Sequence, residues 1–258
     1  MSFRLLAAGE PAPVLEFGRA GGSDFFFTVD HAGTHIPRRL GDLGLPASEL
    51  QRHIASDIGA LDVARRLGAA LDATVVAQNY SRLVIDCNRD PSWPSSIPSV
   101  SEYTQIAGNL GISLEEAAAR RREIFEPYHE HIRTLLNERE RAGRRTIFVA
   151  QHSMTDIFKG VRREMHASVL YNRDRRFAGF MLEALRREPG LIVGDNEPYA
   201  VSDETDYSVP WHAEARRLPH VELEIRQDLI SNEAGQMEWA GRLARALQAA
   251  EQALQATR

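Results

Sequence analysis

Two apolar runs, each of which ends in a histidine, constrain the fold of this chain most strongly. Residues 25–31 read FFFTVDH, and residues 147–152 read IFVAQH. Such near-continuous apolar runs are typical of parallel strands that are buried on both faces. If both runs belong to one parallel sheet, His31 and His152 emerge at its carboxyl edge, where open α/β folds bind their ligands. Because histidine is the commonest protein ligand for zinc-like metals, the two runs predict a metal-dependent hydrolase.

Short apolar runs alternate with helical patterns along the chain, which favours a mostly parallel α/β sheet. We predict strands at residues 24–29, 73–77, 83–86, 146–151, 168–170, 191–193 and 221–226. We predict helices at residues 57–71, 113–143, 175–187 and 237–256. Ser113 opens the second helix with a capping-box pattern, and Pro127 should kink or divide it. The proline- and serine-rich residues 90–99 should form a loop that either lines a site or only connects two elements.

Composition favours a single-domain protein that binds neither nucleic acid nor membranes, and it limits the residues that could hold a metal. The 258 residues are 43% hydrophobic and contain no Pro/Gly/Ser-rich linker, which predicts a single domain over residues 1–258. The net charge is −5, with 31 basic and 36 acidic residues well mixed, so we expect no nucleic-acid partner. We recognise no signal peptide and no apolar run that would span a membrane, and expect a cytoplasmic protein with no membrane partner. With Cys87 as the single cysteine, any metal must be held by His, Asp or Glu.

Further candidate ligands lie near the first histidine. His35 follows His31 across a small turn, in which Gly33 would let the backbone approach a ligand closely. Asp57 stands at the start of a predicted helix, where an acid is favourable against the helix dipole. Alternatively, Asp57 completes a metal site of two histidines and one carboxylate, which leaves a position open for water. The spacing alone favours the first reading of Asp57.

Other charged groups follow predicted strands. One face of the predicted strand over residues 221–226 carries Glu222, Glu224 and Arg226. One of the two acids could act as a general base toward a metal-bound water. Alternatively, this strand lies at the edge of the sheet and these residues face solvent. Arg82 and Arg89 bracket residues 83–86 and would bind an anionic substrate, or else pair with nearby acids. Two further features remain open: residues 195–199 as a polar lid, and His212 as a proton donor, a ligand or a surface residue.

Several of these segments together resemble the N-formylglutamate amidohydrolase family. The matching segments are residues 30–37 (DHAGTHIP), Asp57 with Asp62, residues 81–89 (SRLVIDCNR), residues 151–153 (QHS) and residues 222–228 (ELEIRQD). The resemblance implies a zinc-carboxypeptidase-like fold, a three-layer α/β/α structure around a mostly parallel, mixed sheet of about eight strands. It also implies hydrolysis of an N-acyl amino acid such as N-formylglutamate to the free amino acid and a small carboxylic acid.

Residue roles are carried over from the family position by position. The implied ligands of Zn²⁺, or of another divalent transition metal, are His31, Asp57 and His152. The implied general base is Glu224. The implied contacts to the carboxylate of a small anionic N-acyl amino acid are Arg82, Asn88 and Arg89.

Two departures from the pattern leave alternatives open. Thr34 stands where zinc carboxypeptidases have the acid of a His-x-x-Glu motif, and the loops after Arg89 and over residues 196–212 differ from those of typical members. The alternatives are another metal-dependent carboxypeptidase or deacylase on the same fold, or a non-catalytic anion-binding module. We expect the C-terminal helix to pack on the core, with a homo-oligomer contact as the alternative.

Overall fold

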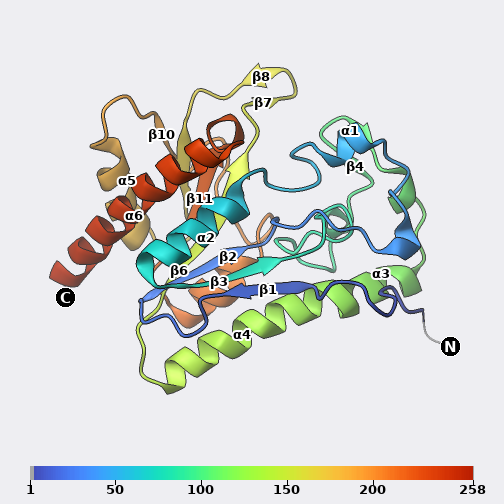
Figure 1. The fold of residues 1–258 in the computed structure, drawn as a ribbon, viewed down its shortest axis with the longest axis horizontal. Coiled ribbons are helices and arrows are strands. Elements are labelled where there is room, and N and C mark those ends of the chain that lie inside the picture. Colours follow the sequence, from blue (N-terminus) through green and yellow to red (C-terminus); the bar gives the residue numbers. More distant parts are fainter. Residues whose placement is uncertain (1–2, 258) are drawn as a thin grey trace.

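A seven-stranded mixed sheet forms the centre of the molecule, with the strand order β1-β3-β2-β6-β11-β9-β10 (Figure 1). The computed structural model describes residues 3–257. The strands of this sheet are β1 (Val14–Phe17), β2 (Phe25–Val29), β3 (Thr74–Gln78), β6 (Ile147–Met154), β9 (Ala167–Leu170), β10 (Val193–Asp195) and β11 (His220–Arg226). Neighbouring strands are parallel except in the pairs β1–β3 and β11–β9. The mostly parallel, mixed sheet is therefore confirmed, with seven strands instead of about eight.

Helices cover both faces of this sheet (Figure 1). One face is covered by α2 (Ala60–Leu71), α5 (Arg176–Arg186) and α6 (Glu233–Ala256), and the other by α3 (Leu114–Arg120) and α4 (Glu126–Arg141). Trp239, Leu243 and Leu247 of α6 are buried against the first face, so the C-terminal helix packs on the core as expected. The three-layer α/β/α architecture expected of a zinc-carboxypeptidase-like fold is confirmed.

The remaining elements are short. A helical turn, α1 (Ala47–Leu50), precedes α2. Two hairpins lie outside the main sheet: β4 (Val100–Ser101) with β5 (Thr104–Gln105), and β7 (Ile157–Phe158) with β8 (Val161–Arg162). The β7–β8 hairpin directly follows β6, which places it at the carboxyl end of the central strands.

The long helix over α3 and α4 follows its sequence signals. Ser113 caps α3 by accepting a hydrogen bond from the Glu116 N–H at 3.1 Å, so the predicted N-cap is confirmed, while the Glu116 carboxylate pairs with Arg120 at 2.6 Å. Pro127 lies in the first turn of α4, and a π-helical turn over Arg121–Phe125 precedes it. A proline inside a helix clashes with the turn before it, so the wider π turn divides the helix at the expected place. Gly143, with φ of 66°, follows the end of α4.

The strand predicted at residues 83–86 is wrong. Leu83 and Val84 are fully buried, as strand residues would be, but their backbone forms turns. Their carbonyl oxygens accept hydrogen bonds from the side chains of Asn109 at 2.8 Å and Arg120 at 3.0 Å. The apolar run therefore packs under α3 and α4 without joining the sheet, since side-chain donors replace the strand ladder.

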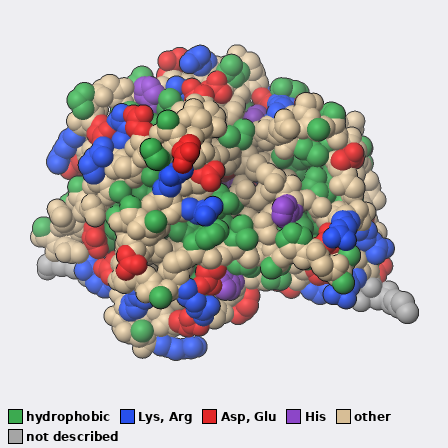
Figure 2. Space-filling model, in the orientation of Figure 1, with side chains coloured by type: hydrophobic (Ala, Val, Ile, Leu, Met, Phe, Trp, Pro, Cys, Tyr) green, Lys and Arg blue, Asp and Glu red, His purple; other side chains and the backbone are tan. Residues whose placement is uncertain are grey.

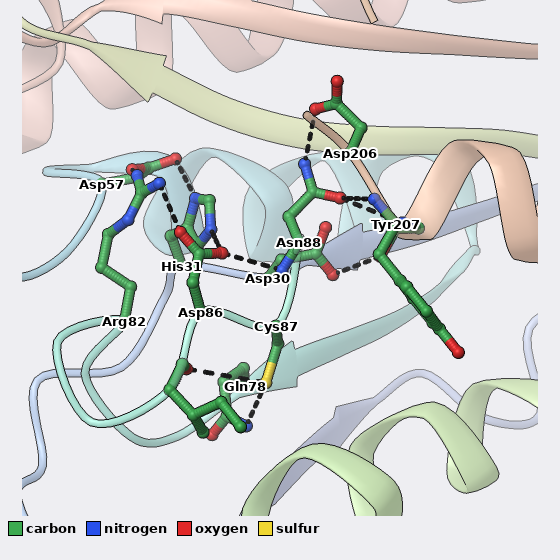
Figure 3. Close-up of polar contacts among 12 residues, drawn as sticks. Asp30, His31, Asp57, Gln78, Arg82, Asp86, Cys87, Asn88, Asp206 and Tyr207 are labelled. Atoms are coloured by element: carbon green, nitrogen blue, oxygen red, sulfur yellow. Dashed lines mark hydrogen bonds and ion pairs between the residues drawn. The ribbon is translucent and has the colours of Figure 1, made fainter. Parts of the chain in front are cut away.

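Cys87 follows this segment and is buried beneath the site (Figure 3). Gln78 of β3 donates a hydrogen bond from Nε2 to its Sγ at 3.2 Å. Burial raises the pKa of the Cys87 thiol well above its ordinary value.

The face of the sheet that α3 and α4 cover changes character along the strands. On β2, Phe26 gives way to Thr28 on this face, and on β6, Phe148 gives way to His152. The opposite face stays apolar on β2, β3 and β11, whereas on β6 it carries the buried polar side chains of Gln151 and Ser153. The polar end of the first face is where the carboxyl ends of the parallel strands meet.

The surface carries no large single-sign region on the side displayed in Figure 2, where acidic and basic side chains are interspersed. Within residues 3–257, no helix is both long and apolar enough to cross a bilayer.

Candidate active site

Three buried side chains converge at the carboxyl end of the sheet. His31 follows β2 with only Asp30 between them, His152 lies in the last part of β6, and Asp57 lies in the loop before α2. One possible ligand atom from each of the three lies within 4.8 Å of the other two. The two imidazole ring centroids are 4.9 Å apart. The sheet therefore brings together the two histidines that end the apolar runs.

The backbone fixes Asp57 between the two strand ends. Its N–H donates to the carbonyl of His31 at 2.9 Å, and its Oδ2 accepts from the N–H of Ser153 at 3.2 Å. The N-cap position of α2 is Gly59, and no side chain caps that helix. Asp57 is thus turned toward the histidines rather than used as a helix cap.

Each histidine lies between the shared Asp57 carboxylate and an acid of its own. Nδ1 lies 2.9 Å from Asp57 Oδ2 in His152 and 3.5 Å from it in His31. The opposite nitrogen, Nε2, lies 2.7 Å from Asp86 Oδ1 in His31 and 3.5 Å from Asp30 Oδ2 in His152. Figure 3 shows His31 between Asp57 and Asp86. Such outer carboxylates fix the tautomer and orientation of a metal-binding imidazole.

The donor set fits a divalent transition metal. The Nδ1 atom of His31 is buried and has no hydrogen-bond partner within residues 3–257. Two imidazole nitrogens and one carboxylate form a set that zinc and related metals accept, with a position left for water. His31, Asp57 and His152 could therefore hold such an ion.

The ionisable groups of the cluster shift one another's pKa values. Burial opposes ionisation of Asp57, but the nearby charge of His31 and the hydrogen bond from His152 outweigh it and lower its pKa. Burial opposes protonation of His152, but Glu222, Asp30 and Asp57 outweigh it and raise its pKa well above the ordinary value. The cluster therefore attracts a positive charge strongly at this point.

Glu224 lies beside His152 because β11 pairs with β6 in parallel, with these two residues in register. β11 is an interior strand of the sheet, and Glu222, Glu224 and Arg226 are all buried, so the wet-edge alternative is ruled out. Glu224 Oε1 accepts a hydrogen bond from the Tyr199 hydroxyl, and Oε2 has no hydrogen-bond partner among the described residues. Burial raises the pKa of Glu224, and it raises that of Glu222 well above the ordinary value.

Arg82 is engaged by the carboxylates of the site. Its Nη2 lies 2.7 Å from Asp86 Oδ2, and its Nη1 lies 3.4 Å from Asp57 Oδ1 (Figure 3). The Arg82 side chain is 25% exposed, whereas the side chains of Asp57 and Asp86 are buried. Arg82 therefore lies at the open side of the cluster and neutralises two of its acids.

Asn88 and Arg89 differ in the contacts that their side chains make. The Asn88 side chain donates to Asp206 at 2.9 Å and accepts from the N–H of Tyr207 at 2.9 Å (Figure 3). It also accepts from the N–H of Ser208 at 2.9 Å. Its amide is thus occupied in holding the segment over residues 206–208. Arg89 is half-buried and makes no ion pair within the part of the chain that the structure describes.

Asp30, Asp86 and Tyr199 were not identified as site residues from the sequence. Asp30 Oδ1 accepts hydrogen bonds from the Tyr128 hydroxyl of α4 at 2.7 Å and from the Ser208 hydroxyl at 2.8 Å. Asp30 and Asp86 each end an apolar run, and that is the signal by which they could have been found. Tyr199 belongs to residues 195–199, and its bond to Glu224 favours the lid interpretation of that segment.

Three other candidates lie outside the cluster. His35 is exposed. His212 is buried and lies with Nε2 2.9 Å from His129 Nδ1, so it is not a surface residue. A Cβ at Gly33 would lie 2.0 Å from the carbonyl carbon of Asn79, so the close approach at this glycine is to backbone and not to a ligand.

Comparison with known proteins agrees with this geometry. A gene product of Agrobacterium tumefaciens of known crystal structure is 36% identical, with 98% of this chain and 100% of that chain covered and a TM-score of 0.95. The N-formylglutamate amidohydrolase from Ralstonia eutropha JMP134 is 19% identical, with 95% and 100% covered and a TM-score of 0.66, which is a likeness of fold. No curated protein matches the chain.

The family model for N-formylglutamate amidohydrolase matches residues 23–231, which contain every residue of the cluster described above. The match begins just before β2 and ends just after β11. The chain therefore belongs to the N-formylglutamate amidohydrolase family.

Proposed function

We propose that this chain is a metal-dependent amidohydrolase that cleaves an N-acyl amino acid, such as N-formylglutamate, to the free amino acid and a small carboxylic acid. Membership of its family supports a hydrolase that acts on amides. One observation carries the proposal: His31 and His152 share Asp57, and each has an outer carboxylate on its other nitrogen. This arrangement is typical of metal-binding histidines.

In the proposal, His31, Asp57 and His152 hold Zn²⁺ or another divalent transition metal. A bound metal would lower the pKa of a water molecule and polarise the acyl oxygen. Asp30 and Asp86 keep the two imidazoles oriented for this task.

Glu224 acts as the general base in this mechanism. Its Oε2, which has no partner within residues 3–257, takes a proton from the attacking water. It then returns the proton to the leaving amine, so the amide C–N bond breaks and the amino acid leaves with a neutral amino group. Burial raises the pKa of Glu224, which makes its carboxylate a stronger base toward the water than an exposed glutamate and brings its pKa closer to neutral pH, where one group can both accept and return a proton. The Tyr199 hydroxyl holds Oε1 and thereby orients the carboxyl.

Arg82, Asn88 and Arg89 form the proposed carboxylate-binding segment for the small anionic substrate. Arg89 and the exposed part of Arg82 supply positive charge, and Asn88 orders the segment through its bonds to residues 206–208. Fixing a substrate carboxylate in this way orients the scissile amide toward the water.

The test is the metal content of the purified protein, measured by mass spectrometry together with hydrolysis of a panel of N-acyl amino acids. We expect about one equivalent of zinc-like metal per chain, and loss of both metal and turnover in the His31→Ala/His152→Ala double variant. His35→Ala is the matched control, because this exposed histidine lies outside the cluster and should retain both. An absence of metal after zinc is supplied, or normal turnover in the double variant, would overturn the proposal.

A further inference from the structure

The arginines near the site differ in how far their charge is already neutralised. Arg82 pairs with Asp57 and Asp86, and Arg52 pairs with Glu49 and Glu102. Arg163, by contrast, makes no ion pair within residues 3–257, although it is only half-exposed. An arginine in this state can still form a bidentate contact with a carboxylate that arrives from solution.

Arg163 is anchored at the carboxyl end of the two strands that carry His152 and Glu224. Its Nη1 donates to the carbonyl of Thr155 at 3.4 Å, directly after β6. Its own carbonyl accepts from Arg226, the last residue of β11, at 3.1 Å. The guanidinium is therefore held at the same edge of the sheet as the metal cluster.

The guanidinium also lies next to the aromatic ring that reaches the general base. Its Cζ is 5.7 Å from the ring centroid of Tyr199 and 5.2 Å from that of Phe158. The hydroxyl of Tyr199 donates to Glu224. One aromatic ring thus links Arg163 to the group that we assign as general base.

We propose that Arg163 is a specificity-determining residue that binds a carboxylate of the N-acyl amino acid. This inference rests on the proposed function of the site and adds a contact from the residue that directly follows β8. The substrate would place one carboxylate on Arg163 and its amide toward Glu224. The alternative is a purely structural role, in which Arg163 only stacks on Phe158 and Tyr199.

The test compares N-formyl-L-glutamate with its two mono-amides, each of which lacks one carboxylate. In Arg163→Ala we expect KM for the diacid to rise by roughly 10- to 100-fold, with little change in kcat. We expect little change in KM for the mono-amide that lacks the bound carboxylate, so the preference of the enzyme for the diacid over that amide collapses. Arg163→Lys should recover part of the loss, since it keeps the charge but not the bidentate geometry.

Arg162→Ala is the matched control. Arg162 is exposed, precedes Arg163 on the same hairpin, and makes no side-chain hydrogen bond or ion pair within the described residues. It should leave KM for all three substrates unchanged. An equal effect of Arg163→Ala on the diacid and both amides would indicate the structural role and overturn the inference.

Binding measured by calorimetry separates this inference from the proposed reaction. In the Glu224→Gln background, we expect Arg163→Ala to weaken binding of N-formyl-L-glutamate by a similar factor. If the wild-type protein hydrolyses no N-acyl amino acid but this binding difference is found, the proposed function fails and the role of Arg163 stands. If hydrolysis is found and Arg163→Ala behaves like Arg162→Ala, the role of Arg163 fails and the function stands. A failure of the background protein to bind the diacid overturns the role of Arg163.

Discussion

The two faces of the central sheet differ in character: one packs apolar side chains against helices, and the other carries the charged groups of the candidate site. On β11, Val221, Leu223 and Ile225 point to the face covered by α2, α5 and α6, while Glu222 and Glu224 point to the other face. A buried apolar side chain contributes roughly 1.5–3 kcal/mol. A buried polar atom without a partner costs about 1–3 kcal/mol. The comparison teaches that a mostly apolar face can offset several costly groups on the opposite face, which leaves those groups available for chemistry.

Glu224→Gln should produce the largest functional change on the polar face. We expect kcat to fall by about 10²- to 10⁴-fold with the metal retained, since the amide cannot accept the proton of the water. Steady-state kinetics and metal analysis of the same sample measure this. If the rate stays normal, Glu224 is not the base, and Glu222 becomes the next candidate.

Leu223→Ala, at the position next to Glu224, should reduce stability and leave the catalytic rate unchanged. Leu223 is 1% exposed on the apolar face, so truncation should cost about 2–5 kcal/mol in free energy of unfolding. The rate per folded molecule should not change. Urea unfolding and active-site-normalised kinetics test this pair of expectations, and a large fall in kcat would show that the two faces are not separable.

Asp30→Asn should weaken metal binding without removing a ligand. We expect metal affinity to fall by about 10- to 100-fold, because the outer partner of His152 loses its charge. Competition with a chelator measures the affinity. Asp62→Asn, on the exposed side of α2, is the control and should bind metal normally. Equal affinity in both variants would contradict the orienting role of Asp30.

Glu222→Gln should give the smallest effect, and one that depends on pH. The pKa of Glu222 is raised in the folded state, so the folded protein binds this proton more tightly than the unfolded chain does. Its contribution therefore reduces stability as the pH rises from the ordinary glutamate range toward the raised value. The glutamine variant should gain about 1 kcal/mol relative to the wild type at pH 8 and less at pH 5. Urea unfolding at both pH values tests the sign, and a loss at pH 8 would mean that the carboxylate is charged and well paired.

The sequence predicted best those elements that are buried on both sides. β2, β3, β6 and β11 are covered by helices on both faces, so they read as apolar runs with clear ends. β1 was not predicted, because it is a half-buried edge strand in which Glu16 interrupts a short apolar pattern. Residues 83–86 gave the same signal as a strand because burial, and not strand pairing, selects apolar side chains.

The candidate site was predictable at the strand ends and less so between them. His31, His152 and Glu224 follow from runs whose direction and register place them together. The orienting role of Asp86 depends on which imidazole nitrogen faces it, and this is a property of the fold that no local pattern encodes. The structural use of the Asn88 amide depends on residues 206–208, more than a hundred positions away.

The burial of Cys87 has a practical consequence for following this protein in solution. The thiolate is the reactive form of cysteine, and a buried thiol with a raised pKa stays protonated. Maleimide dyes should therefore leave the folded wild-type chain unlabelled. A cysteine introduced at the exposed Val161 of the β7–β8 hairpin would carry the only attached dye, so movement of that hairpin around the site could be recorded without first removing the native cysteine.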